Sequence, residues 1–521
     1  MVIKLGNNEN IIQNNKRMIG WMLLGMMAAI LFSRFLTLTH EMSFHLDEPN
    51  IYRSSVSLAE KVLHPEQVYQ VALVYPEGSY VMQMPFHLLS RIVGSEWGDR
   101  VWARIASVCY YSAGCLTGAL CLYRFMGRRR GSVVFFGMLC VFSLFYVEQS
   151  RYGTGDPPSF FLLMVLLFAC GQFIQTKRNR WLCLAGLCVG ALGAVKYPQI
   201  YFLLLPAPLA FSKERKWGGM LHFLMLLGCM LAGFLMLSPS LLVWPEYLVE
   251  SIRRETDAYM RSWSGFTPLE NLLELLIYHL LYAEFPLAPV LMLCAAVSGR
   301  KAGGKQTKER LDFWKCWVPL VTFIFVVYNL FVGLLVFRTL NPFFAVAMLY
   351  SAWALDSLWR KKGWKPVLAV LCGLMIIRSS ALLSFMTVPD QSEALRAHML
   401  QSDCWEERKN TVVLGNIGGY CPEPVRYSPM DQLTWFAFPE VESGEFVITA
   451  AMEYGYVKRA VLKDLVVYPI EDKWDAFVAE NLTGLIKNAY PQWYYSMFGY
   501  WLPASSGALF EFPNMCLFYC P

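Results

Sequence analysis

The sequence predicts a polytopic α-helical membrane protein with a soluble C-terminal domain. Hydrophobic residues make up 56% of its 521 residues and charged residues only 16%, whereas about 25% of an ordinary soluble protein is charged. The mean hydropathy of +0.38 excludes a disordered chain, and one soluble core could not bury so much apolar surface. Most of this surface must therefore face lipid.

Apolar runs long enough to form membrane spans recur through residues 18–385, since a spanning helix needs about 20 apolar residues. The first run is too long for a cleavable signal peptide. A break at Lys196-Tyr197-Pro198 predicts a tight turn between two short spans. The eleven expected spans are 18–39, 99–123, 131–149, 157–176, 181–197, 198–212, 218–238, 271–297, 316–337, 341–358 and 366–386.

The distribution of basic residues predicts the orientation of these spans, because cytoplasmic loops collect Lys and Arg. Six segments on alternate connections hold 23 of the 45 basic residues. The polar tail 1–17 is therefore expected in the cytoplasm, ahead of a membrane domain over 18–385. An odd number of spans then puts residues 386–521 outside, together with the loops 40–98, 148–157 and 239–270. The six segments are 4–17, 124–130, 177–180, 213–216, 300–315 and 360–365.

Residues 386–521 have the composition of a soluble domain, with 9 Lys and Arg against 17 Asp and Glu. Strand-like runs at 411–414 and 446–449 among turn-rich segments predict a small external α/β domain. Four of the 15 cysteines lie in it, and an even number in an oxidising compartment suggests disulfides. Pairing of Cys404 with Cys421 and of Cys516 with Cys520 closes the shortest loops, although sequence alone leaves the other connectivities open.

Charged residues next to external span ends are the first candidates for function, because burial near a membrane is costly for them. Asp47 and Glu48 follow the first span, and adjacent carboxylates can divide proton transfer from substrate orientation. They could instead simply begin a helix, with Pro49 in its first turn and the acids at the positive end of the helix dipole.

Further candidates lie at other external span ends. Asp156 precedes two prolines and is either a site carboxylate or the N-cap of the next span. Lys196 and Arg338 are cations at the ends of apolar helices, against the positive-inside trend. Snorkelling explains one such residue, whereas several facing acidic residues suit an anionic ligand.

Six segments follow one another along residues 18–358 in a characteristic order: the Asp47-Glu48 pair, Tyr75–Pro85 (YPEGSYVMQMP), Gly98–Ser107 (GDRVWARIAS), Arg151–Pro158, the Lys196-Tyr197 turn and Arg338-Thr-Leu-Asn-Pro342. In this order they resemble the integral-membrane glycosyltransferases of the GT-C class. The branch that looks closest contains the protein O-mannosyltransferases and the aminoarabinose (lipid A) transferases.

The resemblance implies a polyprenyl-phosphate monosaccharide as donor, in a bacterial inner membrane, and an acceptor attacked on the external face. By similarity Asp47 is the general base, Glu48 is its neighbour in the site, and Asp156 is a second carboxylate. The implied substrate-binding residues are Arg104, Arg151, Lys196 and Arg338, with Tyr80 or His87 in place of a Lys-Pro-Pro element that this chain replaces by Met84-Pro85-Phe86.

The chemistry of such a reaction agrees with these residue types. A sugar joined to a lipid phosphate already has a good leaving group, so cations for the phosphate and a carboxylate for the acceptor proton suffice. Direct displacement would invert the anomeric centre. The loop 239–270 predicts an amphipathic interfacial helix, which either borders the lipid entrance or merely lies on the bilayer.

The sequence leaves three points open. No HExxH, DxD or Cys/His cluster predicts a tight metal site, so no cofactor is expected, although a divalent cation stays possible. A transporter or flippase of lipid-linked sugars and a non-catalytic scaffold are the alternatives; charges deep in several spans and inverted repeats would favour the transporter. The sugar and the acceptor, whether glycolipid, polysaccharide or protein, are open, and no nucleic acid is expected as a partner.

Overall fold

A computed structural model gives the structure of this chain. It describes residues 2–35, 38, 48–66, 76–126, 130–212, 216–242, 244–260, 268–269, 272, 275, 312–331, 337–385, 411–414, 426–427, 446–450, 468–469 and 515–519. The chain divides into two compact units, one formed by Met1–Leu36 with Pro49–Ser379 and the other by Thr37–Glu48 with Ser380–Pro521.

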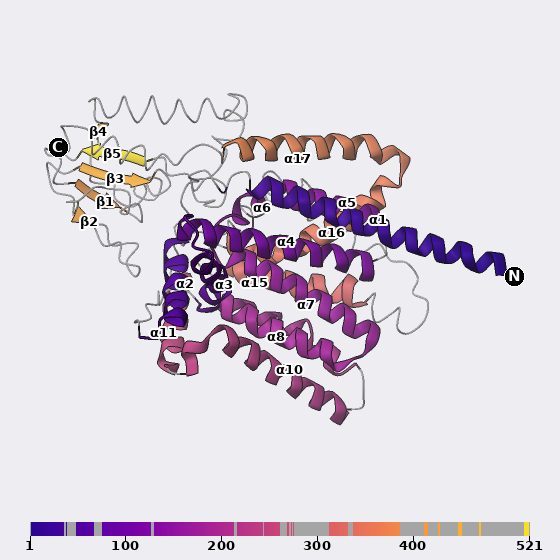
Figure 1. Cartoon of the computed structure of the whole chain (residues 1–521), viewed down its shortest axis with the longest axis horizontal. Coiled ribbons are helices and arrows are strands. Elements are labelled where there is room, and N and C mark those ends of the chain that lie inside the picture. Colours follow the sequence, from indigo (N-terminus) through magenta and orange to yellow (C-terminus); the bar gives the residue numbers. More distant parts are fainter. Residues whose placement is uncertain are drawn as a thin grey trace. The chain divides into compact units, whose positions relative to one another are not determined.

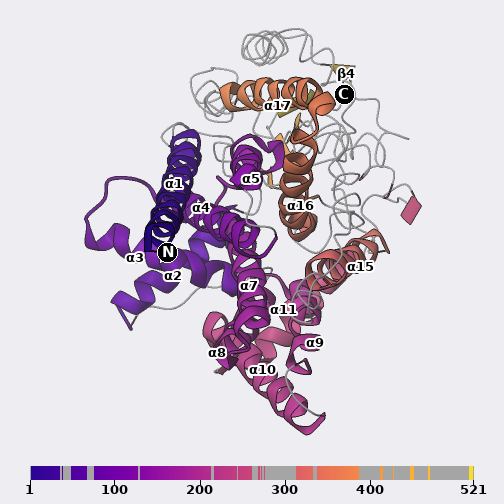
Figure 2. The same cartoon turned by 90° about the vertical axis from the view of Figure 1, so that its right-hand side faces the viewer.

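Apolar helices make up most of the first unit. Helices α4, α7, α8 and α10 lie side by side in that order (Figure 1), and neighbouring helices in the series pack closely. Helix α16 packs along α5 (Figure 2). The long helices are α1 (Val2–Phe35), α4 (Asp99–Phe125), α5 (Arg130–Phe142), α7 (Asp156–Thr176), α8 (Asn179–Val195), α10 (Lys216–Leu237), α15 (Val318–Phe331), α16 (Asn341–Trp359) and α17 (Lys365–Phe385).

The lengths and apolar character of these helices are those of a multi-pass membrane protein. Within the described residues, five helices are long and apolar enough to cross a bilayer: Met18–Phe35, Asp99–Phe125, Asp156–Thr176, Gly218–Leu237 and Phe313–Phe331. Helix α7 is the innermost of the five, because 83% of its apolar window is buried. The α5 and α8 helices are apolar but shorter.

Glycines allow α8 and α10 to approach closely. A Cβ atom at Gly190 would lie 1.9 Å from the backbone oxygen of Met230, and one at Gly233 would lie 2.2 Å from that of Leu187. Small residues at such crossings let helix backbones pack directly, which is how membrane helices gain van der Waals contact without a hydrophobic driving force. These glycines thereby bring the backbones of α8 and α10 into direct contact.

Two expected spans are not continuous helices. The run at 131–149 is divided at Ser143 into α5 and the short α6 (Leu144–Gln149). Residues 198–212 form a 3-10 helix, η1 (Tyr197–Leu204), and the one-turn α9 (Ala207–Ala210). The prolines at 198, 206 and 208 explain this second interruption, because proline lacks the N–H that a continuing helix needs. The turn predicted at Lys196 is confirmed, since α8 ends at Val195.

The expected span at 271–297 lies almost wholly outside the described residues, so the count of eleven remains a prediction. The loops 40–98 and 239–270 carry α2 (Glu48–Leu63), α3 (Gly78–Ile92), η2 (Pro239–Leu242) and α11 (Pro245–Met260). Arg91 on α3 joins its own helix to α2 and to α4, since it pairs with Glu60 on α2 at 2.7 Å and with Asp99 on α4 at 2.9 Å.

The second unit contains a five-stranded mixed sheet with the order β2-β1-β3-β5-β4. β1 runs parallel to β2 and β3, and β5 runs antiparallel to β3 and β4. The strands predicted near 411–414 and 446–449 are confirmed. Cys404, Cys421 and Cys520 lie outside the described residues, so the disulfide pairing stays a prediction. The strands are β1 (Thr411–Leu414), β2 (Arg426–Tyr427), β3 (Phe446–Ala450), β4 (Tyr468–Pro469) and β5 (Met515–Tyr519).

Candidate functional site

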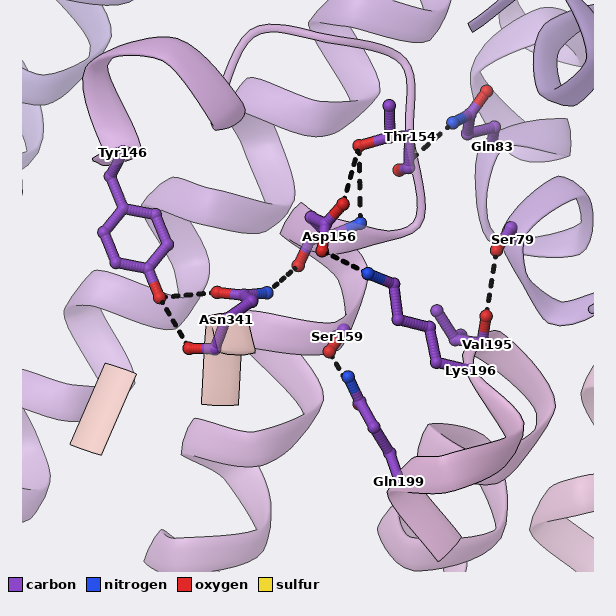
Figure 3. A network of polar contacts seen from close by, with 10 residues as sticks. All are labelled: Ser79, Gln83, Tyr146, Thr154, Asp156, Ser159, Val195, Lys196, Gln199 and Asn341. Atoms are coloured by element: carbon purple, nitrogen blue, oxygen red, sulfur yellow. Dashed lines mark hydrogen bonds and ion pairs between the residues drawn. The ribbon is translucent and has the colours of Figure 1, made fainter. Parts of the chain in front are cut away.

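An ion pair between Asp156 and Lys196 is the centre of the candidate site (Figure 3). Asp156 is the first residue of α7 and is only 3% exposed. Lys196 directly follows α8, where its extended backbone (φ −148°, ψ 109°) ends the helix. Asp156 and Lys196 are 40 residues apart in sequence. They meet because the N-terminus of α7 and the C-terminus of α8 lie at the same end of the helix layer.

Further contacts fix the Asp156 carboxylate. The Thr154 hydroxyl donates to Asp156 Oδ2 over 3.5 Å and accepts the Asp156 backbone N–H over 3.4 Å. Gln83 on α3 donates to the Thr154 backbone oxygen over 3.5 Å. The N-cap of α7 is Gly155, and Asp156 lies inside the first turn. Asp156 is therefore not the N-cap, and its side chain is held by Lys196 and Thr154 next to the positive end of the helix dipole.

Glycines bring three chain segments together at this point. A Cβ atom at Gly155 would lie 2.6 Å from Ser79 Oγ, and one at Gly78 would lie 2.6 Å from the backbone of Ala194. The Ser79 hydroxyl in turn donates to the Val195 backbone oxygen over 3.1 Å. The start of α3 thus packs against the backbone at the end of α8, and the α6–α7 loop packs against the Ser79 side chain. A side chain at Gly78 would force α3 and α8 apart.

Three buried arginines, hereafter the arginine cluster, lie near this end of the unit: Arg34 on α1, Arg104 on α4 and Arg151 in the α6–α7 loop. Arg151 donates to the Ser33 backbone oxygen over 3.1 Å. Burial, together with the charges of Arg34 and Arg104, holds the pKa of Arg151 below its ordinary value. Three cations this near one another favour an anionic group beside them.

Helix ends and aromatic rings hold the arginine cluster in place. Arg34 donates to the backbone oxygens of Cys140 over 3.0 Å and Val141 over 3.2 Å, at the end of α5. The Arg104 guanidinium lies over the Tyr152 ring, 5.8 Å from its centroid. A cation at a helix C-terminus and a cation over an aromatic face are both stabilised electrostatically.

The structure groups some of the predicted site residues and separates others. Asp156 and Lys196 are in contact, and Arg104 and Arg151 are both in the arginine cluster. Glu48 is the first residue of α2, as the helix-start interpretation predicts, and its side chain is buried. Asp47 lies outside the described residues.

The remaining predicted residues lie on two other segments. Tyr80 is buried on α3, where its backbone oxygen accepts the Ser55 hydroxyl over 2.9 Å. His87 is buried further along the same helix, with Nδ1 3.8 Å from the Asp99 carboxylate, so it lies at the contact of α3 with α4. Arg338 is in the 3-10 helix η4 (Phe337–Leu340), and its side chain is outside the described part of the structure. Their roles in substrate binding remain predictions.

Three residues near the site have no role in the sequence-based prediction. Asn341, the first residue of α16, donates from Nδ2 to the Asp156 backbone oxygen over 2.8 Å. Tyr146 donates to Asn341 Oδ1 over 2.5 Å. Glu77 is buried and accepts both the backbone N–H and the hydroxyl of Ser240, over 3.1 and 2.7 Å. Asn341 and Glu77 lie within the segments that carry the family resemblance, and that position is the signal that could have marked them.

Metal binding finds no support among the residues that the structure describes. In those ranges, no group of three or more His, Cys, Asp or Glu side chains is arranged to hold a metal ion.

Comparison with known proteins finds similarity to glycosyltransferases. Residues 95–244 match the family model described as dolichyl-phosphate-mannose-protein mannosyltransferase. The fold matches that of ArnT from Cupriavidus metallidurans bound to undecaprenyl phosphate, with a TM-score of 0.53 at 14% identity, over 87% of this chain and 97% of that one. The resemblance to GT-C glycosyltransferases is confirmed. At this identity, the structural likeness establishes the fold alone.

Two more solved structures are similar at lower scores. One is ArnT from Cupriavidus metallidurans in the apo state, with a TM-score of 0.49 at 13% identity, over 88% of this chain and 97% of that one. The other is the Archaeoglobus fulgidus oligosaccharyltransferase in complex with Zn and sulfate, with a TM-score of 0.44 at 11% identity, over 85% of this chain and 70% of that one. A sequence comparison with curated proteins finds no match.

Proposed function

We propose that this GT-C-like protein transfers a monosaccharide from a polyprenyl-phosphate donor to an acceptor on the external face of a bacterial inner membrane. The observation that carries this proposal is the pair of buried Asp156 and partly exposed Lys196 in the same unit as the arginine cluster. Cations gathered at one end of apolar helices suit a ligand whose tail lies in lipid and whose head is a phosphate. Undecaprenyl phosphate, the lipid bound in the ArnT structure, has this chemistry.

The reaction requires an attacking acceptor and a leaving phosphate. The acceptor oxygen forms a bond to the anomeric carbon while the bond from that carbon to the phosphate oxygen breaks, and the electron pair stays on the phosphate. The cations Arg104, Arg151, Lys196 and Arg338 stabilise the charge that the phosphate gains. Asp47 takes the acceptor proton. One direct displacement of this kind inverts the anomeric configuration.

Asp156 has a different role from Asp47 in this proposal. Its carboxylate is already engaged by Lys196 and Thr154, so we assign to it the orientation of the Lys196 ammonium and not proton transfer. Lysine has a long flexible stem, and a fixed carboxylate reduces the entropy that it loses when it binds a phosphate. Glu48, adjacent to the base, is assigned to acceptor orientation.

The transporter alternative gains no support from these observations, because the matched family model is that of a transferase. The proposal does not name the sugar or the acceptor, and both can be identified by experiment. Mass spectrometry of envelope glycolipids and glycoproteins from cells with and without the gene identifies both. A sugar substituent missing only from the deletion strain is expected, whereas identical glycan profiles in the two strains would contradict a transferase role in the envelope.

Loss of single cations is expected to weaken donor binding. Arg151→Gln and Arg338→Gln should each lower the affinity for polyprenyl phosphate in nanodiscs by about tenfold or more, because a charge-assisted hydrogen bond contributes roughly 1.5 to 3 kcal/mol. Arg178→Gln, at an exposed cytoplasmic position before α8, is the matched control and should bind as the wild type does. Unchanged affinity in a folded Arg151→Gln variant would remove the arginine cluster from the phosphate site.

The proposed orientation places the site outside the cell and the basic loops in the cytoplasm, with residues 386–521 forming an external domain. Gly98 before α4 and Gly363 after α16 are both exposed, and a Cβ atom at either position meets nothing within 4 Å. In intact cells, an impermeant thiol reagent should therefore label Gly98→Cys but not Gly363→Cys, and lysis should make both reactive. The parent protein measures the labelling of the natural cysteines. The reverse pattern would invert the topology and every proposed site with it.

A further inference from the structure

The Tyr146–Asn341 bridge consists of one buried tyrosine and one buried asparagine that meet beside Asp156 (Figure 3). The Tyr146 hydroxyl donates to Asn341 Oδ1 over 2.5 Å and lies 3.1 Å from the Asn341 backbone oxygen. The Asn341 amide then donates to the Asp156 backbone oxygen over 2.8 Å. Tyr146 is 2% exposed and Asn341 is fully buried. The bridge thus connects α6, the first turn of α7 and the first turn of α16.

Capping of α16 does not explain why an asparagine is buried at position 341. The helix has Leu340 as its N-cap, with no side-chain hydrogen bond there, and Pro342 follows Asn341 directly. Asn341 is 185 residues from Asp156 in sequence. An amide that is fully buried costs free energy unless it is hydrogen-bonded, and Asn341 makes its bonds across helices instead of within its own.

The position of Asn341 gives the bridge a consequence for the site. It immediately follows η4, the turn that carries Arg338. Asp156, at the other end of the bridge, pairs with Lys196. The Asn341 amide therefore links the segment that carries Arg338 to the residue that pairs with Lys196, and both of these cations are proposed to bind phosphate. Aromatic packing fixes the other side of the bridge, since the Tyr146 ring stacks on Tyr111 with centroids 5.1 Å apart.

We propose that Asn341 and Tyr146 are positioning residues that act through Asp156 to hold Lys196 in register with Arg338. The inference rests on the proposed function for its catalytic consequence, but not for its structural one. The phosphate gains charge as the glycosidic bond breaks, so misplaced cations lose more in the transition state than in the donor complex. Loss of the bridge should therefore lower kcat more than donor affinity.

Chemical labelling of Lys196 tests the structural part without any activity assay. Acetylation of the detergent-solubilised protein is measured by mass spectrometry, with exposed Lys361 as the internal reference. Asn341→Ala and Tyr146→Phe should raise the relative rate at Lys196 by about fivefold, the change expected when one buried hydrogen bond is lost. Tyr146→Phe keeps the ring and its packing. Unchanged rates in both variants would overturn the inference.

Two variants in the same unit are matched controls. Asn329 is a nearly buried asparagine whose amide donates to Phe325 within its own helix over 2.8 Å. Tyr350 is a buried tyrosine on α16 whose hydroxyl donates to the Trp314 backbone oxygen. Asn329→Ala and Tyr350→Phe should leave the Lys196 labelling rate at the wild-type value. An equal rise in the controls would reveal general loosening of the unit and would overturn the assignment to the bridge.

Kinetics with Lys196→Gln test the catalytic part. Asn341→Ala should lower kcat by about tenfold or more, lower the affinity for polyprenyl phosphate by a smaller factor, and have little further effect in the Lys196→Gln background. Additive losses would show that Asn341 does not act through Lys196, which overturns the proposal. If the wild type transfers no sugar at all, the proposed function fails while the labelling result still decides the structural role of the bridge.

Discussion

Asp47→Asn is expected to abolish measurable sugar transfer while the protein still inserts into the membrane. Asparagine has the shape of aspartate but cannot accept the proton of the acceptor hydroxyl, and loss of a general base costs roughly 10²- to 10⁴-fold in rate. The measurement is transfer from a polyprenyl-phosphate sugar by the purified protein in nanodiscs. Asp312→Asn, at an exposed position on the proposed cytoplasmic side, is the control and should retain full turnover.

Near wild-type turnover of Asp47→Asn would eliminate Asp47 as the base and would direct attention to Glu48. Helix α2 begins at Glu48, and this acid in its first turn also stabilises the helix through its dipole. Glu48→Gln therefore separates the two interpretations of the pair. A lower unfolding temperature with normal turnover fits a helix-start residue, whereas lost turnover at an unchanged unfolding temperature fits a site residue.

Sequence analysis predicted those parts of the fold that depend on the order of apolar and polar residues within one segment. Apolar runs of spanning length predicted the helices, and the Lys196-Tyr197-Pro198 break predicted an interruption there, next to which α8 ends at Val195. The same method failed over 198–212, because a 3-10 segment and a one-turn helix are as apolar as a regular span. Only the three prolines marked the difference, and proline can also occur at the start of a regular helix.

The contacts within the site depend on packing and could not be predicted from sequence. Asp156 and Lys196 were both candidates, but nothing local shows that they bind each other. Arg34 illustrates the same limit. A buried charge is costly unless it is paired, and the partners of Arg34 include the Cys140 and Val141 backbone oxygens. These oxygens are available because α5 ends at Phe142, a break that no residue pattern in the 131–149 run predicted.

Neutralising both Asp156 and Lys196 should restore the stability that is lost when Lys196 alone is replaced, but it should not restore sugar transfer. Lys196→Gln leaves the Asp156 carboxylate, whose side chain is 4% exposed, without its cation. Removing one partner of a buried ion pair costs roughly 3 to 5 kcal/mol, because the remaining charge is uncompensated. We therefore expect a clear fall in the thermal unfolding temperature of Lys196→Gln, and none for Lys361→Gln at an exposed position.

The double variant Asp156→Asn/Lys196→Gln removes both charges, so it should recover most of the lost stability, since neutral amides in this place can hydrogen-bond to each other. Donor binding and transfer should not recover, because the ammonium proposed to contact the phosphate is still missing. Unfolding temperature and transfer rate, measured on the same preparations, separate the two effects. Recovery of transfer in the double variant would mean that Lys196 serves only to neutralise Asp156, and the phosphate contact would then belong to the arginine cluster and Arg338 alone.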